Sequence, residues 1–111
     1  MRYLVVTTNS EGGGNVAVVM HDHVSGVVIC RSLSESFLRI FDAFATKHDV
    51  KLLRVFKSIQ VTAYGIRNYD WVDSVVTKVV DAVDPWVLGE QGIVQGQSVE
   101  DVVQKYLGGS V

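Results

Sequence analysis

The sequence predicts one α+β domain over residues 1–111: an antiparallel meander of three strands, a helix, one or two further strands, a second helix and a C-terminal helix. Apolar and polar residues alternate in the first third of the chain, as they do in half-buried strands. Apolar residues recur at helical spacing in later segments. A length of 111 residues suits a single hydrophobic core.

The first three strands are expected at residues 3–8, 15–21 and 27–31. β-Branched and aromatic residues crowd together in the first segment, and the second alternates apolar with polar side chains. The glycine-rich segment 9–14 and the polar segment 21–26 favour turns between these strands. Strands joined by short turns pair antiparallel, so the three segments predict a meander.

A first helix is expected to begin at Ser32 and to end near His48. Ser32 and Glu35 have the spacing of a capping box, in which each side chain satisfies a backbone donor. Lys47 and His48 place positive charge at the C-terminal end, where the helix dipole favours it. The expected buried face consists of apolar residues at helical spacing: Leu33, Phe37, Ile40, Phe41 and Phe44.

Residues 51–66 alternate apolar with polar side chains on both sides of Lys57 and Ser58. This pattern predicts either one long kinked strand or a tight hairpin, and the sequence does not separate the two.

A second helix is expected from Asp70 to Val83, followed by a stop at Asp84 and Pro85. Six valines fall on one stripe of this helix: Val72, Val75, Val76, Val79, Val80 and Val83. Because valine is a mediocre helix former, the stripe must be held by packing, and the sheet is the expected partner.

The C-terminal part begins with an irregular crossing at residues 86–97, which contains a brief strand at Trp86–Leu88. Ser98 then caps a short helix that is expected to stop at Gly108 and Gly109. The expected buried side of this helix comprises Val99, Val102, Val103, Tyr106 and Leu107.

Composition excludes several classes of protein. A formal net charge of −2 argues against a protein held to nucleic acid by bulk positive charge. No apolar run approaches the roughly 20 residues needed to cross a bilayer, and Met1 is not followed by a signal-peptide pattern. Cys30 is the only cysteine, so it forms neither an internal disulfide nor a multi-cysteine zinc site. We therefore expect a soluble, cytoplasmic protein without cofactor or membrane association.

The order of expected elements resembles the ribonuclease H-like arrangement over nearly the whole chain. That family performs metal-dependent phosphodiester chemistry with carboxylates from the first strand, the first helix, the fourth strand and the last helix. Glu35 and Asp101 match the two helix positions. Residues 7–9 and 57–58 carry no acid where the two strand carboxylates would be. The resemblance therefore implies a fold of this kind without catalytic activity.

His21 and His23 are the candidate metal ligands. Histidines two positions apart on a strand point to the same side and can bind a metal together with a third ligand. The surrounding Asp22, Ser25 and Gly26 are typical of a polar turn, which is the favoured interpretation of this stretch.

Charge is distributed unevenly along the chain. Residues 1–67 carry eight basic and five acidic side chains, whereas residues 68–111 carry two basic and seven acidic ones. An acidic helix face beside tryptophan and tyrosine favours protein recognition, because these aromatic residues dominate binding hot spots. The candidate partner-binding residues are Tyr69, Asp70, Trp71, Asp73, Asp81 and Trp86. The alternative for the two tryptophans is that both complete the core, since tryptophan is highly buried on average.

The favoured function is a non-enzymatic protein–protein interaction module that binds another protein, or itself, through the acidic helix and the crossing at residues 86–97. A modulator or inhibitor of a larger cellular machine, encoded by a virus or a mobile element, fits this size. Two alternatives stay open. A metal-dependent nuclease or nucleotide-processing enzyme would use Glu35 and Asp101 with His21 and His23, and a nucleic-acid binder would use Lys51, Arg54, Lys57 and Arg67. The many valines also suggest a homodimer through an exposed strand or the valine helix.

Overall fold

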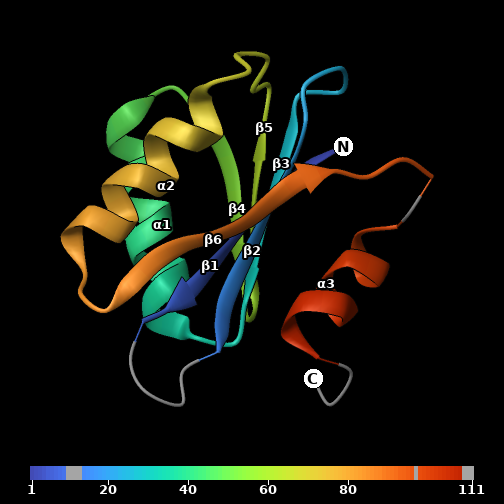
Figure 1. The fold of residues 1–111 in the computed structure, drawn as a ribbon. Helices are drawn as coiled ribbons and strands as arrows, with labels where there is room; N and C mark the ends of the chain where they lie inside the picture. The colour runs from blue at the N-terminus through green and yellow to red at the C-terminus, as the bar shows by residue number, and fades with distance from the viewer. Residues whose placement is uncertain (10–13, 97, 109–111) are drawn as a thin grey trace.

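The computed structural model describes residues 1–9, 14–96 and 98–108, which form a six-stranded antiparallel sheet with three helices (Figure 1). The expected α+β class, the meander and the order of elements are confirmed. Most of the turn expected at 9–14 lies outside the described residues, as does Gly109. No helix in the described ranges is long and apolar enough to cross a membrane. The elements are β1 (Arg2–Thr8), β2 (Asn15–Asp22), β3 (Val27–Ser32), α1 (Glu35–His48), β4 (Leu53–Lys57), β5 (Gln60–Tyr64), α2 (Trp71–Ala82), β6 (Trp86–Ile93) and α3 (Val99–Leu107).

The strands lie in the order β4-β5-β3-β2-β1-β6, and helices lie on both faces of the sheet. α1 and α2 pack side by side on one face, and α3 lies alone on the other (Figure 1). Successive side chains of a strand point to opposite faces, so the central strands contribute to two separate clusters. The sheet is therefore the shared middle layer of two cores.

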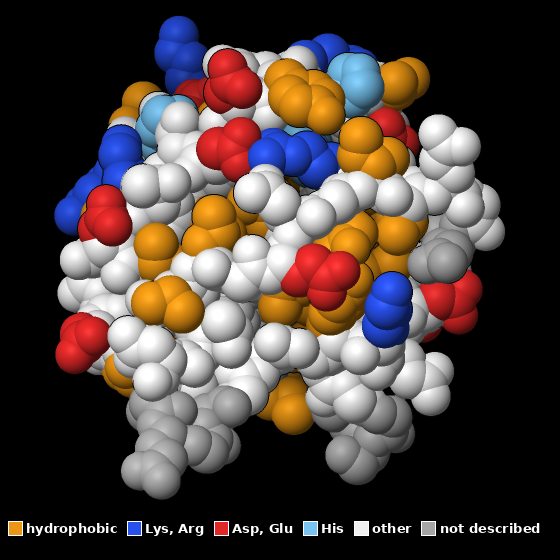
Figure 2. Space-filling model, in the orientation of Figure 1, with side chains coloured by type: hydrophobic (Ala, Val, Ile, Leu, Met, Phe, Trp, Pro, Cys, Tyr) orange, Lys and Arg blue, Asp and Glu red, His pale blue; other side chains and the backbone are white. Residues whose placement is uncertain are grey.

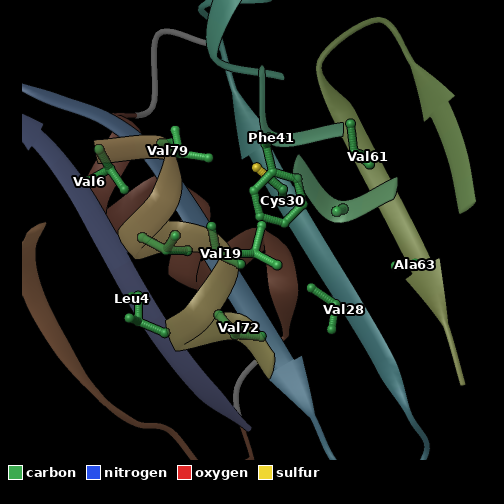
Figure 3. Close-up of a cluster of buried hydrophobic side chains, with 14 of the residues drawn as sticks. Leu4, Val6, Val19, Val28, Cys30, Phe41, Val61, Ala63, Val72 and Val79 are labelled. Atoms are coloured by element: carbon green, nitrogen blue, oxygen red, sulfur yellow. The ribbon is translucent and has the colours of Figure 1, made fainter. Parts of the chain in front are cut away.

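The larger core lies between the sheet and the pair α1 and α2 (Figure 3). Val19 and Cys30 of the sheet face Phe41 of α1, and Val72 and Val79 of α2 pack over the same region. Burial among these apolar side chains raises the pKa of the Cys30 thiol, so Cys30 behaves as a small hydrophobic residue.

The smaller core lies under α3. Tyr3, Val5, Val18 and Met20 of β1 and β2 pack against Val102 and Val103 of α3. The Tyr106 hydroxyl donates to the Tyr3 hydroxyl at 2.7 Å. The expected cap is confirmed, because Ser98 and Asp101 form a capping box at the start of α3.

The start of α1 differs from the expectation. The N-cap is Ser34, whose Oγ accepts from the Phe37 amide at 3.3 Å. The Ser32 hydroxyl instead donates to the Val16 carbonyl at 2.7 Å, so Ser32 belongs to the sheet. The capping box of Ser32 with Glu35 is therefore wrong, and Leu33 precedes the helix as an exposed residue.

Two segments are more regular than the sequence indicated. Residues 53–64 form a tight hairpin, with β4 and β5 joined at Ser58 and Ile59. β6 is a full eight-residue strand paired with β1, where only a brief strand at Trp86–Leu88 was expected. Gly92 lies against the Tyr3 ring, and a Cβ there would stand 2.9 Å from the Tyr3 hydroxyl oxygen. A larger residue at position 92 would crowd the Tyr3 ring, so the glycine that interrupts the apolar pattern leaves room for this side chain.

The valine stripe of α2 predicts a strong effect of one substitution. Val76 is fully buried against the sheet. Val76→Asp places an unpaired charge in this core, so we expect the free energy of unfolding to fall by about 3–5 kcal/mol or more. Thermal unfolding checks this, with Thr77→Asp on the exposed face of α2 as the control. A Val76→Asp protein as stable as this control would contradict the buried stripe.

The contact between α3 and β1 predicts a late tyrosine titration. The hydrogen bond from Tyr106, followed by burial, raises the pKa of Tyr3 from 10.0 to about 12. Because the folded-state pKa is the higher one, the stabilisation is complete below pH 10 and is lost as pH rises through 12. We expect an absorbance titration to show a step near pH 12 that Tyr3→Phe removes and Tyr69→Phe retains. A step that survives Tyr3→Phe would contradict the assignment.

Candidate functional site

The sheet face that carries α3 is covered over only part of its width. α3 packs on β1 and β2, and beside it a groove of about 390 Å³ opens over β3, β5 and β4. We call the side chains of these three strands on the α3 side the open face. The groove is lined by Arg31, Val55, Lys57, Ser58, Ile59, Gln60, Thr62 and Tyr64.

Strand register explains why these residues share a face. Val55 lies opposite Thr62, Lys57 opposite Gln60, and Leu53 opposite Tyr64. Side chains directly opposite each other in an antiparallel pair point to the same side. The intervening Val61 and Ala63 point the other way, into the core under α1 and α2 (Figure 3).

Large apolar side chains stay in solvent on the open face. Leu53 is 68% exposed, Tyr64 43% and Val55 37%. Phe56 is also exposed, on the opposite side of β4, where the Arg39 guanidinium lies 5.5 Å from its ring centre. Exposed apolar residues that gather in one place mark interaction surfaces more often than isolated ones do.

A chain of polar contacts joins α3 to the open face. Arg31 donates through Nη2 to Glu100 of α3 at 2.6 Å and through Nε to Gln60 at 2.9 Å. Gln60 in turn donates to the Thr62 hydroxyl at 2.8 Å. Arg31 also lowers the pKa of Glu100, which keeps this carboxylate ionised. These contacts hold the side chains of Arg31, Gln60 and Thr62 in the groove lining.

The basic residues expected to bind nucleic acid do not form one patch. Lys57 and Arg54 are three positions apart on β4 and therefore point to opposite faces. Arg54 forms an ion pair with Asp42 of α1, and Arg67 donates to the Val24 carbonyl at the turn after β2. Lys51 precedes β4. The interpretation of these residues as a single nucleic-acid patch is therefore wrong, because strand alternation and ion pairing divide them.

The two tryptophans of the expected partner-binding surface belong to the core. Trp71 is buried, with its ring centre 6.4 Å from that of Phe41. Trp86 packs on Phe37 at 4.9 Å between ring centres. The structure agrees with the interpretation in which the tryptophans complete the core: Trp71 is buried and Trp86 is partly buried, because the first turn of α2 and the start of β6 both face α1.

The acidic residues expected beside them are dispersed. Asp73 forms a 2.6 Å ion pair with Arg2, whose guanidinium also lies 5.4 Å from the ring centre of Tyr69. Asp70 and Asp81 are exposed near the two ends of α2. Figure 2 shows acidic side chains scattered among hydrophobic and uncharged ones on the side that carries β6. Tyr69 is the one aromatic residue of this set that is largely exposed.

The candidate metal and catalytic residues do not meet in one site. His21 is buried, and its Nε2 lies 2.7 Å from the Ile66 carbonyl oxygen, which assigns a proton to Nε2. His23 follows the end of β2 and contacts the Tyr69 ring edge-on. Among the described residues, no group of three or more His, Cys, Asp and Glu side chains is placed to hold a metal ion.

The two acids of the nuclease hypothesis lie on different layers. Glu35 belongs to α1 and pairs with Arg39 at 2.5 Å, whereas Asp101 belongs to α3 and closes its capping box. α1 and α3 lie on opposite faces of the sheet (Figure 1). Both acids therefore perform local helix-end roles at separate places.

Comparison of the chain with protein-family models, curated proteins and solved structures returned no match. The resemblance to the ribonuclease H-like arrangement therefore stays a prediction. The open face itself is the feature that sequence reasoning missed. Its signal was the alternation of residues 53–64.

Proposed function

We propose that this chain is a non-enzymatic protein-binding module whose open face receives a segment of a partner protein. The observation that carries the proposal is the set of exposed apolar side chains around the 390 Å³ groove. Leu53, Val55 and Tyr64 expose apolar surface that folding leaves uncovered, and binding a partner would remove it from water. Arg31, Gln60 and Thr62 lie beside these apolar side chains in the groove, and interfaces combine apolar contacts with hydrogen-bonding groups in this way.

The unpaired basic side chain of the groove favours a partner segment that carries a carboxylate. Arg31 is paired with Glu100, which leaves Lys57 as the unpaired cation among the described lining residues. Lys57 lies on the open face itself, where a partner carboxylate would meet it. The chemistry that fits is a segment whose apolar side chains contact Val55 and Tyr64 and whose carboxylate contacts Lys57.

A protein fits this surface better than a nucleic acid does. The groove has two basic side chains, and Glu100 already neutralises Arg31, so one free cation faces a ligand among the described lining residues. Nucleic-acid binding relies on several basic contacts to phosphates.

If the partner protein needs the bound segment for its own activity, binding to the open face blocks that activity. The chain would then act as a modulator or inhibitor of its partner. Burial of Cys30 as a free thiol suits a reducing compartment such as the cytoplasm.

Two tyrosines of similar exposure provide a matched test. Tyr64 lies on the open face and is 43% exposed, and Tyr69 lies beside α2 and is 46% exposed. We expect Tyr64→Ala to reduce partner binding at least tenfold, because aromatic anchors contribute most to interfaces, and Tyr69→Ala to leave it unchanged. The measurement is affinity capture from nuclease-treated lysate of the organism that encodes the chain, followed by titration of the recovered partner against both purified variants.

Each contrary outcome is specific. If Tyr69→Ala loses partner binding and Tyr64→Ala retains it, the partner binds the acidic surface of α2 and not the open face. Recovery of nucleic acid in a parallel capture from untreated lysate, with no protein sensitive to Tyr64→Ala in either lysate, would support the nucleic-acid alternative. Circular dichroism of both variants shows that the fold is retained.

A further inference from the structure

The sheet has two outer strands, and they differ in regularity. β6 pairs with β1 through a register shift, where Gly89 and Glu90 lie opposite Val5 alone. A bulge of this kind protects a strand edge from pairing with another chain. β4 pairs with β5 over five consecutive positions without a shift, so its outer edge is regular.

β4 also carries exposed apolar residues on both sides. Leu53 and Val55 point to the open face, and Phe56 points to the α1 side. A regular outer strand with exposed apolar side chains is a template for pairing with a further strand. The valine stripe of α2, the other surface considered for a dimer, is buried in the core.

We propose that a second copy of this chain pairs with β4, antiparallel, about a two-fold axis at Val55. In this register Val55 faces Val55 of the second copy. Leu53 faces Lys57, and Arg54 faces Phe56, on each side of the axis. An interface of this kind uses the same patch on both copies, as in most homodimers.

The charges of β4 suit this centred register. The two copies of Lys57 lie at opposite ends of the paired strands, about 14 Å apart at roughly 3.4 Å per residue, which exceeds the Debye length of about 8 Å. Asp42 neutralises Arg54 within its own chain. Arg54 then stands opposite Phe56 of the second copy, near the Arg39 guanidinium that lies 5.5 Å from the centre of that ring. Asp42 offsets the charge of Arg54 there, and no two charged residues of β4 stand directly opposite each other in this register.

Pairing of this kind would join the two open faces. The two-fold axis of an antiparallel strand pair stands perpendicular to the sheet, so both copies of α3 lie on the same side. The grooves meet at the axis, where Val55 and Thr62 of each copy form the centre of one floor. The two α3 helices would lie beyond the outer sides of this floor, each joined to Arg31 through Glu100. This shared groove rests on the proposed function, whereas the pairing itself does not.

Charge substitutions at the axis test the pairing. We expect the parent mass, measured by sedimentation, to rise from 12.2 kDa towards twice that value as concentration increases. Val55→Lys and Val55→Asp should each remain monomeric, because like charges would face each other across the axis. Mixing the two variants should restore a dimer that contains one copy of each. Val24→Lys, at a 72% exposed turn position, is the control and should dimerise like the parent.

Three results would overturn the proposal: a parent that is monomeric up to millimolar concentration, a dimer unaffected by either Val55 variant, or two folded monomeric variants that do not associate on mixing. Tyr64→Ala separates this test from that of the proposed function, because Tyr64 lies one strand in from the edge. A dimeric Tyr64→Ala protein that binds no partner supports both proposals. A monomeric parent that loses its partner on Tyr64→Ala overturns the dimer alone.

Discussion

The rest of the structure depends on one constraint: the sheet is wider than its three helices can cover on both faces. Six strands about 4.8 Å apart span about 24 Å between the outer strand axes. A helix with its side chains is about 10 Å wide. Two helices therefore cover most of one face, and α3 alone covers less than half of the other. The uncovered part of that face is the candidate site.

On the α3 side of the sheet, the type of side chain depends on whether α3 covers it. Beneath α3 the strands present Val5, Val18 and Met20, which are buried. Beside α3 they present Arg31, which bonds to Glu100 of α3 and to Gln60, and Thr62, which accepts from Gln60. The change from apolar to polar residues keeps an uncovered sheet face compatible with water. The apolar residues that remain there, on β4 and at the end of β5, are the ones that a binding partner explains.

Local signals in the sequence predicted much of the fold and little of the site. The helix positions follow from periodicity and caps, which act within a few residues. Trp71 is four residues before Val75, so helical spacing alone places it beside the buried stripe, although its residue type suggested an exposed anchor. Gly92 interrupts the apolar pattern of β6, so the sequence indicated only a short strand there. The role of this glycine is explained by its contact with Tyr3, which is distant in sequence. The alternation of apolar and polar residues predicts that Leu53 lies on one face of the sheet. Only the three-dimensional structure shows that nothing in the described chain covers this side chain.

The direct test of the half-covered sheet is the relative reactivity of the tyrosines towards nitration, measured by mass spectrometry on the folded protein. We expect Tyr64 to react about as readily as Tyr69, since the two are similarly exposed, and Tyr3 to be protected beneath α3. Pairing of two copies through β4 leaves this result unchanged, because Tyr64 lies on the face and one strand in from the edge. A Tyr64 as protected as Tyr3, with Tyr69 still reactive, would show that the face is covered in solution.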